Sequence, residues 1–406
     1  MCARPPDRRA HPKHHHTRRS FEPARLMPVR TLSLDGFRSY GHLEVEFGDG
    51  PHVVVGRNAA GKTNLIEALV LLSSGRSHRS STDTEMVRWG ADFGRASAQV
   101  ETAGRREELE VVVHAKGSGP GARKRIRVNG VNRRASALPS VLRTVLFAPE
   151  DMLLIIGSPS LRRNLLDGLV AQREPTAAAV MSTYQRTLTQ RNSLLRRIRE
   201  EEAGRAELSY WDTAIVESGS RILDWRQQTL SAMAGPLADA HREIAPEETS
   251  LALRYASNVE PGQSESNEAA LRRRLRETAD KEVWNGATLV GPHRDDFVFE
   301  SAGRELTEFA SRGQQRTAIL ALKMAELELL TLLDGRPPLL LLDDVFSELD
   351  PERRAHLVRR IGSLPQAIVT TTTPDDLDRA LVAASTLWQV EPGSVRSADG
   401  GAPGAP

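Results

Sequence analysis

Hydrophobic and polar positions alternate with a period of two over the N-terminal third of the chain, which is typical of half-buried strands. The alternation covers residues 30–47, 97–114 and 124–135. Residues 140–147 (SVLRTVLF) predict one more strand. The three alternating segments together predict an antiparallel sheet.

The period changes to that of an amphipathic helix between residues 160 and 235. A Glu-Glu-Ala-Gly break at 201–204 divides this stretch, which predicts an antiparallel helical hairpin. The second helix is expected to end at Gly235-Pro236, because glycine and proline stop helices. A short strand at 251–255 and a helix at 267–281 complete this insert.

Beyond Gly286 the pattern becomes α/β again. A helix is expected from about Gly313 to Leu333, followed by four leucines at 339–342. A continuous apolar run is typical of a strand that is buried on both faces of a parallel sheet. Residues 367–371 predict another strand of that sheet.

The fold class is therefore α/β, with an antiparallel β subdomain and a helical, short coiled-coil-like insert. The tails lack core-forming residues and are expected to be disordered. The expected parts are a basic tail at 1–27, an N-terminal head part at 28–158, the insert at 159–285, a C-terminal head part at 286–392 and a tail at 393–406.

A phosphate-binding loop is predicted where three valines precede a G-x-x-x-x-G-K-[ST] pattern and an apolar helix pattern follows it. Glycines let the backbone N–H groups turn toward phosphate oxygens, and the helix N-terminus favours an anion. The alternative is an ordinary glycine-containing turn. The expected nucleotide-binding residues are Gly56, Arg57, Asn58, Ala59, Ala60, Gly61, Lys62 and Thr63.

Two carboxylates follow the leucine run, at the strand end where open α/β sheets bind ligands. Asp343, with the Thr63 hydroxyl, is expected to bind Mg²⁺, and Asp344 to orient or deprotonate a water molecule. The alternative is a solvated or helix-capping acidic pair. Ser311–Gln315 precedes a long helix and predicts a second anion site, or a plain helix cap by Ser311.

Composition excludes only a few classes of function. The chain has 406 residues, 27% of them charged, and a formal net charge of +2, which by itself does not indicate a nucleic-acid partner. Cys2 is the single cysteine, which excludes a disulfide within one chain and favours the cytoplasm. The longest apolar runs are too short to cross a bilayer. The first 26 residues lack the apolar segment of a secretory signal, and Met27 is an alternative start.

The order of Gly56–Thr63, Ser311–Gln315, Leu339–Asp344 and Ser347–Asp350 resembles that of the ABC-type ATPase heads of the SMC class. Three segments make the resemblance more specific, and they are similar to the RecF family of bacterial recombination mediators. These segments are LSLDGFRSY (32–40), APEDMLLIIGSPSLRRNLLD (148–167) and GPHRDDF (291–297).

This resemblance implies a site that two subunits share. Arg38 is expected near the phosphates, Lys62 and Asp344 are expected to be catalytic, and Asp343 to be the Walker B metal residue. ABC ATPases commonly have a glutamate where this chain has Asp344, so slow turnover is implied. The residues expected to reach the γ-phosphate of the partner subunit are Ser311, Arg312, Gly313 and Gln314.

The resemblance also implies a function in DNA replication, recombinational repair and the SOS response. It implies an ATP-dependent homodimer with weak, DNA-stimulated ATPase activity that binds duplex DNA at single-strand gaps. RecO and RecR are the implied partners in placing recombinase, and no membrane is involved. The alternative is an ABC-type ATPase subunit coupled to a membrane transporter.

Overall fold

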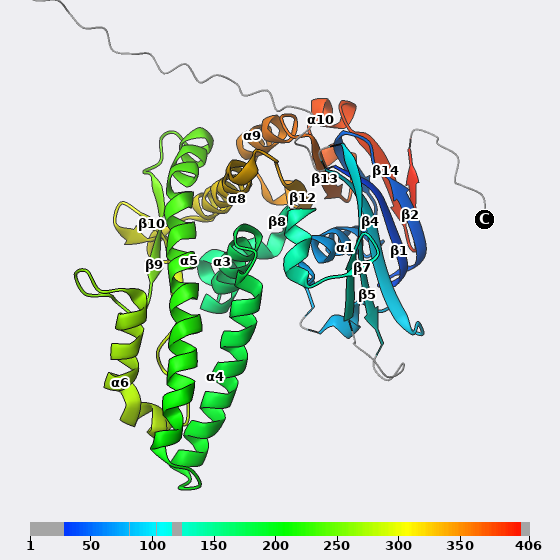
Figure 1. Cartoon of the computed structure of the whole chain (residues 1–406). Coiled ribbons are helices and arrows are strands. Elements are labelled where there is room, and N and C mark those ends of the chain that lie inside the picture. Colours follow the sequence, from blue (N-terminus) through cyan, green and yellow to red (C-terminus); the bar gives the residue numbers. More distant parts are fainter. Residues whose placement is uncertain (1–27, 81, 103, 116–123, 399–406) are drawn as a thin grey trace, which may run out of the picture.

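Two sheets enclose the first long helix of the chain, and a bundle of helices projects beside them (Figure 1). The computed structural model describes residues 28–80, 82–102, 104–115 and 124–398. The predicted N-terminal tail and most of the predicted C-terminal tail lie outside these ranges.

The first sheet is parallel apart from one edge strand, and its order is β15-β14-β3-β13-β12-β8. Every residue of β12 is buried, as its run of leucines predicts. The strands are β3 (Gly50–Val55), β8 (Thr144–Phe147), β12 (Leu339–Asp343), β13 (Gln366–Thr371), β14 (Thr386–Glu391) and β15 (Ser394–Ser397).

The second sheet is antiparallel, in the order β2-β1-β4-β5-β6-β7, and confirms the predicted alternation. Its outer face carries a ladder of charges in which Asp35, Arg95, Glu110 and Arg127 lie 3.5, 2.8 and 3.1 Å from one another in turn. The strands are β1 (Val29–Phe37), β2 (Tyr40–Glu46), β4 (Phe93–Thr102), β5 (Arg105–His114), β6 (Lys124–Val128) and β7 (Val131–Asn132).

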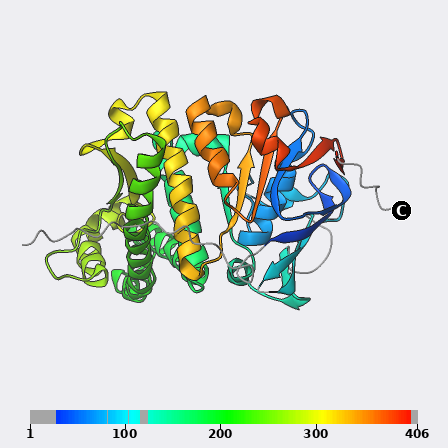
Figure 2. The same cartoon turned by 90° about the horizontal axis from the view of Figure 1, so that it is seen from above.

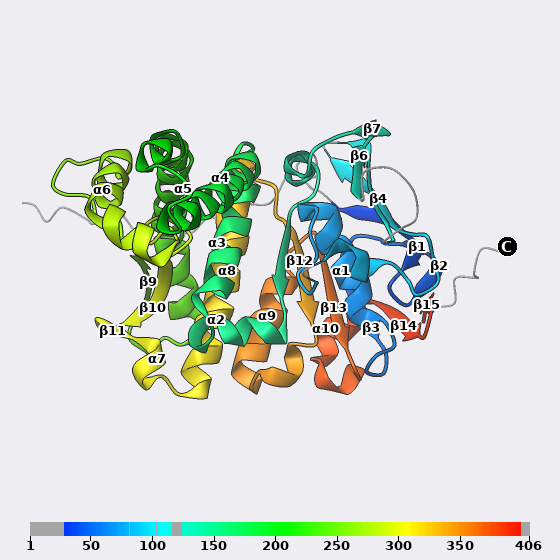
Figure 3. The same ribbon diagram turned by 90° about the horizontal axis from the view of Figure 1, so that it is seen from below.

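Helix α1 (Lys62–Ser74) lies between the two sheets (Figure 3), where Leu65, Ile66 and Leu69 are fully buried. Other helices cover the opposite face of the parallel sheet, and Figure 2 shows α8 in gold and α9 in orange beside it. These helices are α2 (Leu153–Ile156), α3 (Pro159–Arg173), α7 (Leu306–Phe309), α8 (Arg312–Asp334), α9 (Pro351–Ile361) and α10 (Arg379–Ala383).

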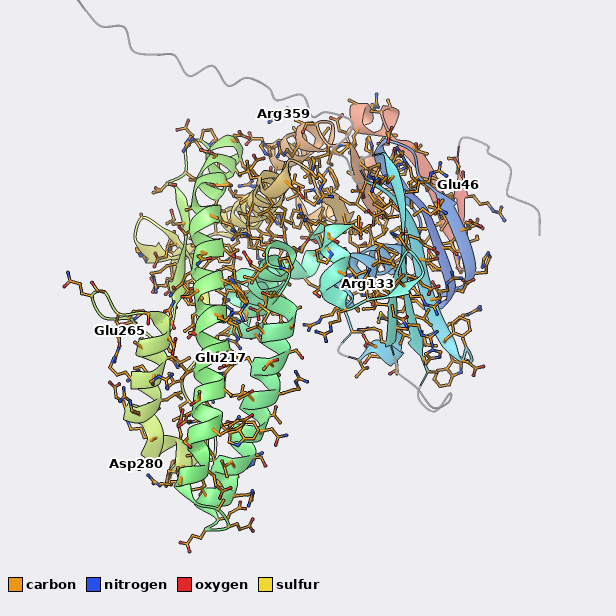
Figure 4. The ribbon with its side chains drawn as sticks, viewed as in Figure 1. Glu46, Arg133, Glu217, Glu265, Asp280 and Arg359 are labelled. Atoms are coloured by element: carbon orange, nitrogen blue, oxygen red, sulfur yellow. The ribbon has the colours of Figure 1, made fainter. Side chains whose placement is uncertain are left out.

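The projecting bundle, called the arm below, consists of α4 (Ala177–Arg199), α5 (Leu208–Ile244) and α6 (Asn267–Asn285). It confirms the predicted helical hairpin. Figure 4 shows charged side chains along the outside of the arm. A small sheet of β9 (Leu251–Ala256), β10 (Asp296–Ser301) and β11 (Arg304–Glu305) lies at its base.

Two predicted boundaries are wrong. Helix α5 continues through Gly235 and Pro236 to Ile244, because Met233, Leu237 and Ala240 are buried against the head, and this burial outweighs the cost of an interior proline. The chain is also ordered beyond residue 393. Strand β15 pairs with β14 across a Pro-Gly turn in which Gly393 has φ +81°.

Candidate functional site

The phosphate-loop segment joins the carboxyl end of β3 to the N-terminus of α1, as predicted. Gly61 has φ +121°, and a Cβ at this position would lie 2.7 Å from the Tyr40 hydroxyl oxygen, so only glycine fits. Ala59 has φ +63°, a conformation that residues other than glycine rarely adopt. The loop is therefore tight and locally strained.

The Lys62 side chain folds back over its own loop. Its Nζ donates to the carbonyl oxygens of Gly56 at 2.6 Å and Arg57 at 3.2 Å. Burial lowers the pKa of the Lys62 ammonium, and the nearby carboxylates of Asp344 and Asp343 oppose that shift. The ammonium thus rests on neutral oxygens, which negatively charged phosphate oxygens can replace.

The two predicted magnesium ligands meet, although they are 280 residues apart in the sequence. The Thr63 hydroxyl donates to Asp343 Oδ1 at 3.2 Å, and the Thr370 hydroxyl donates to the same oxygen at 2.6 Å. Asp343 is 5% exposed. A hydroxyl and a carboxylate are hard oxygen ligands, and Mg²⁺ commonly takes one or two of them and completes its shell with water and phosphate oxygens.

Asp344 lies beside this pair in a strained conformation, with φ +56°. Its N–H donates to the Thr370 carbonyl at 3.2 Å and to the Thr370 hydroxyl at 3.0 Å. Burial raises the pKa of the Asp344 carboxyl, Lys62 opposes the rise, and Asp343 adds to it. A strained carboxylate with a shifted pKa at a strand end is typical of functional sites.

Arg38 directly follows β1, and its side chain contacts α1 at Glu67. Its guanidinium donates to both Glu67 oxygens at 2.8 and 2.6 Å and to the Glu85 carbonyl at 2.6 Å, and it also hydrogen-bonds Ser80. The Glu67 side chain is fully buried. The structure therefore assigns Arg38 a structural partner on α1, and its contact with phosphates stays a prediction.

The second predicted anion site begins α8. The Ser311 hydroxyl accepts the Gln314 N–H at 3.3 Å, and Gln314 Oε1 accepts the Ser311 N–H at 3.0 Å, which forms a capping box. The plain-cap interpretation therefore holds within one chain. Ser311 and Arg312 are exposed, and no hydrogen bond or ion pair among the described residues joins 311–314 to the phosphate loop.

The GPHRDDF segment lies at the base of the arm and is filled with internal contacts. Asp296 accepts two hydrogen bonds from Arg162 at 2.8 and 2.7 Å, and His293 Nδ1 accepts from the Tyr184 hydroxyl at 2.7 Å. Nowhere in the described ranges do three His, Cys, Asp or Glu side chains form a metal cluster. The segment is therefore an ion-paired junction between the head and the arm.

Sequence reasoning missed Tyr40, Glu67 and Thr370. Tyr40 donates to the Gly61 carbonyl at 3.1 Å, and Glu67 accepts from Arg38. The Thr370 hydroxyl donates to the Asp343 carboxylate and accepts the backbone N–H of Asp344. A single sequence offered a signal for Tyr40 alone, because this residue ends the LSLDGFRSY segment.

Comparison with known proteins assigns the family. Residues 28–393 match the family described as RecF/RecN/SMC N terminal domain. The DNA replication and repair protein RecF of Limosilactobacillus fermentum is 36% identical over 374 residues, which cover 91% of this chain and 99% of that protein. The chain belongs to the RecF family. The protein of the same description from Symbiobacterium thermophilum is 39% identical over 375 residues, which cover 91% and 98% of the two chains.

Solved structures agree with this assignment. The structure described as the recombination mediator protein RecF-ATPrS in the RecFOR pathway has a TM-score of 0.84 and 30% identity, and the match covers 92% of this chain and 99% of that chain. The Smc head domain from Pyrococcus furiosus, bound to the C-terminal domain of ScpA, is 17% identical with a TM-score of 0.51 over 92% and 96% of the chains. That likeness concerns the fold alone, and it agrees with the predicted ABC-type ATPase head.

Proposed function

We propose that this chain is an ATP-dependent DNA-binding protein of DNA replication, recombinational repair and the SOS response. The observation that carries the proposal is the contact between Thr63 and Asp343 beside Lys62, because it unites three parts of a nucleotide site from both ends of the chain. Proteins described as DNA replication and repair protein RecF are similar to the chain over nearly its whole length.

ATP binds in this proposal with its phosphates on Gly56–Thr63 and with Lys62 at the outer phosphates. Thr63 and Asp343 would hold a Mg²⁺ ion, which would offset the negative charge of the phosphates. Asp344 orients the attacking water. Its side chain is shorter than that of a glutamate, which supports slow hydrolysis. These roles fit the oxygen ligands and the strained loop described above.

A homodimer forms when ATP is bound, because Ser311 and Arg312 are exposed and, among the described residues, no hydrogen bond or ion pair joins 311–314 to the phosphate loop of the same chain. A partner subunit can present these residues to the γ-phosphate. The helix N-terminus supplies N–H groups that favour an anion. RecO and RecR are proposed as further partners on the strength of the RecFOR description of a similar structure.

Duplex DNA at single-strand gaps is the proposed ligand of the dimer. The contacts of three groups of arginines indicate which of them are available for DNA phosphates. Arg162 and Arg163 are tied to the junction, and Arg272–Arg274 have carboxylate partners. Arg196 and Arg197 are exposed, and no carboxylate of the described residues pairs with them. Of these three arginine groups, Arg196 and Arg197 are therefore best suited to phosphate contacts.

The transporter alternative gains no support from the relatives named above. Over the described residues, no helix has both the length and the apolar character needed to cross a bilayer.

A mobility-shift assay with gapped and intact duplex DNA, with and without ATP, tests the proposal. We expect ATP to increase the affinity of the chain for gapped duplex. In Lys62→Ala, ATP should no longer increase that affinity. Equal binding with and without ATP would contradict an ATP-gated function.

A further inference from the structure

A buried ion cluster in the head takes no part in the site described above. Lys323 lies in the middle of α8 with 3% of its side chain exposed, and its Nζ lies 3.1 Å from Asp151 Oδ1 and 3.3 Å from Glu326 Oε1. Burying charges removes their hydration, so a buried ion pair often stabilises a fold less than apolar residues of the same volume. Its contribution to stability is therefore no guide to its role, which follows instead from the elements that the cluster joins.

Lysine is itself unusual at this position. Of the 55 basic residues only six are lysine, and Lys62 and Lys323 are the two that are buried within the described ranges. A compact ammonium fits a buried space that a planar guanidinium does not. The chain thus departs from its preference for arginine at the phosphate loop and at this cluster.

Asp151 connects two parts of the head through its two carboxylate oxygens. One oxygen faces Lys323, and the other accepts the N–H of Ala148 at 2.8 Å. Ala148 is the first residue after β8 and precedes the 3₁₀ turn at Pro149–Met152. Asp151 therefore fixes the shape of the turn that leaves β8 and joins this turn to α8.

This turn starts at the edge of the sheet that carries the nucleotide site. Strand β8 pairs in parallel with β12, and Phe147 lies opposite Leu342, so Ala148 leaves the sheet beside Asp343. At the other end of the connection, α8 begins after Ser311, about 18 Å along the helix from Lys323. A continuous helix moves as one body, so a displacement at Lys323 reaches Ser311.

We propose that Lys323 is a positioning residue that couples the turn beside Asp343 to Ser311 through its contact with Asp151. The inference rests on the proposed function, in which the start of α8 completes the nucleotide site of the partner subunit. It explains how nucleotide binding in one subunit sets the position of Ser311 in that same subunit. The Lys323–Asp151 pair connects a nucleotide-facing turn with a partner-facing helix, and it does so without touching either ligand.

The chain offers a matched control for this pair. Arg143 immediately precedes β8 and donates to both oxygens of Asp334, the last residue of α8, at 3.0 and 2.7 Å. The Arg143 side chain is 8% exposed. This second pair joins the same two elements at the opposite edge of the sheet, away from the nucleotide site.

The test compares the full-length chain with Lys323→Met, with the neutral double variant Asp151→Asn/Lys323→Met, and with Arg143→Met. In the double variant the amide oxygen still accepts the Ala148 N–H, and no unpaired lysine remains to disturb folding. Burial raises the pKa of Glu326 to about 7, so this carboxyl readily becomes neutral once the lysine is gone. ATP affinity is measured on dilute monomer, and ATP-driven dimerisation by sedimentation.

We expect both Lys323 variants to bind ATP within about twofold of wild type and to dimerise between about fivefold and 150-fold more weakly, the usual range of coupling between sites. Arg143→Met should lower thermal stability and leave ATP-driven dimerisation unchanged. If wild type neither binds ATP nor dimerises, the proposed function itself fails. If wild type dimerises and the double variant matches it, or if Arg143→Met weakens dimerisation equally, the coupling role is wrong.

Discussion

The nucleotide edge of the head and the arm both bury charged side chains, but they satisfy these charges differently. In the arm, Arg191 donates to Glu282 at 2.7 Å, to Asp212 at 2.9 Å and to Thr288 at 2.8 Å, and it is 2% exposed. At the nucleotide edge, Lys62 donates only to backbone carbonyls, and among the described residues no hydrogen bond joins it to the nearby carboxylates.

The difference separates a structural use of charge from a functional one. A buried charge that only stabilises a fold is paired with opposite charges at close range, because an unpaired one is costly. The nucleotide edge instead keeps a cation, two carboxylates and a strained loop close together, with no direct ion pair between Lys62 and either carboxylate among the described residues. Such an arrangement leaves charge available for a ligand and its metal ion.

The comparison is tested most strongly by Lys62→Ala. We expect ATP affinity to fall about a hundredfold or more, because each charge-assisted hydrogen bond contributes about 1.5–3 kcal/mol. ATP-dependent dimerisation should be lost and the fold should remain. Nucleotide titration and circular dichroism measure these effects, and Lys281→Ala, on the surface of α6, is the control. Unchanged affinity would refute the assignment of the loop.

Ser311→Arg tests whether an ordinary helix cap also serves a partner subunit. We expect normal ATP binding by the monomer and no ATP-driven dimerisation, because a bulky side chain fills the space beside the γ-phosphate. Loss of the cap alone costs about 0.5–2 kcal/mol. The matched control is Ser266→Arg, since Ser266 caps α6 in the arm by accepting the Ala269 N–H. Sedimentation that shows normal dimers for Ser311→Arg would exclude the shared site.

Arg191→Met tests the structural side of the comparison. Removal of the guanidinium leaves Glu282 buried without its partner, so we expect the arm to lose about 3–5 kcal/mol of unfolding free energy. ATP affinity should stay the same. Hydrogen exchange in α4–α6 measures the loss. Arg272→Met breaks the exposed pair with Glu268 and should cost less than about 1 kcal/mol. Equal losses of unfolding free energy in the two variants would show that burial of the Arg191 ion pair is not the cause of the loss.

Asp344→Asn tests the strained carboxylate. We expect ATP to bind normally and its hydrolysis to slow by about a hundredfold, because a general base contributes at least that much. The ATP-bound dimer should therefore live longer, which light scattering can follow. The amide preserves the backbone contacts with Thr370. Unaltered turnover would place the base elsewhere.

The sequence predicted the parts of the head whose structure is local. A buried apolar run, a glycine-rich loop and a capped helix are each encoded within about ten residues, so β12, the loop before α1 and the start of α8 lie where expected. The pairing of Thr63 with Asp343 could also be expected, because strand order in such sheets brings both to one edge.

Contacts between distant segments could not be predicted in the same way. Arg38 binds Glu67 instead of remaining free, and Thr370 fixes Asp343 from a neighbouring strand. Helix α5 passes through Pro236 because its far half packs on the head. Each of these depends on a three-dimensional neighbour that local spacing does not reveal, and tertiary packing overrides local propensity.

The smallest predicted effect concerns His293 in the arm junction. Burial, with smaller contributions from neighbouring arginines, lowers the pKa of His293 to about 4. The unfolded chain therefore binds more protons than the folded chain between about pH 6.5 and 4, so the stability that depends on a neutral His293 is complete above pH 6.5 and falls with decreasing pH.

We expect the free energy of unfolding to decrease by about 2 kcal/mol between pH 7.5 and pH 5 through this residue. His293→Gln should remove that part of the pH dependence, since a glutamine does not titrate. Burial raises the pKa of the nearby Asp295, which shifts the profile in the opposite direction, so the difference between wild type and variant isolates His293. Urea unfolding at several pH values measures it. Parallel profiles for the two proteins would mean that His293 is solvated in the folded chain and that the arm junction does not bury it.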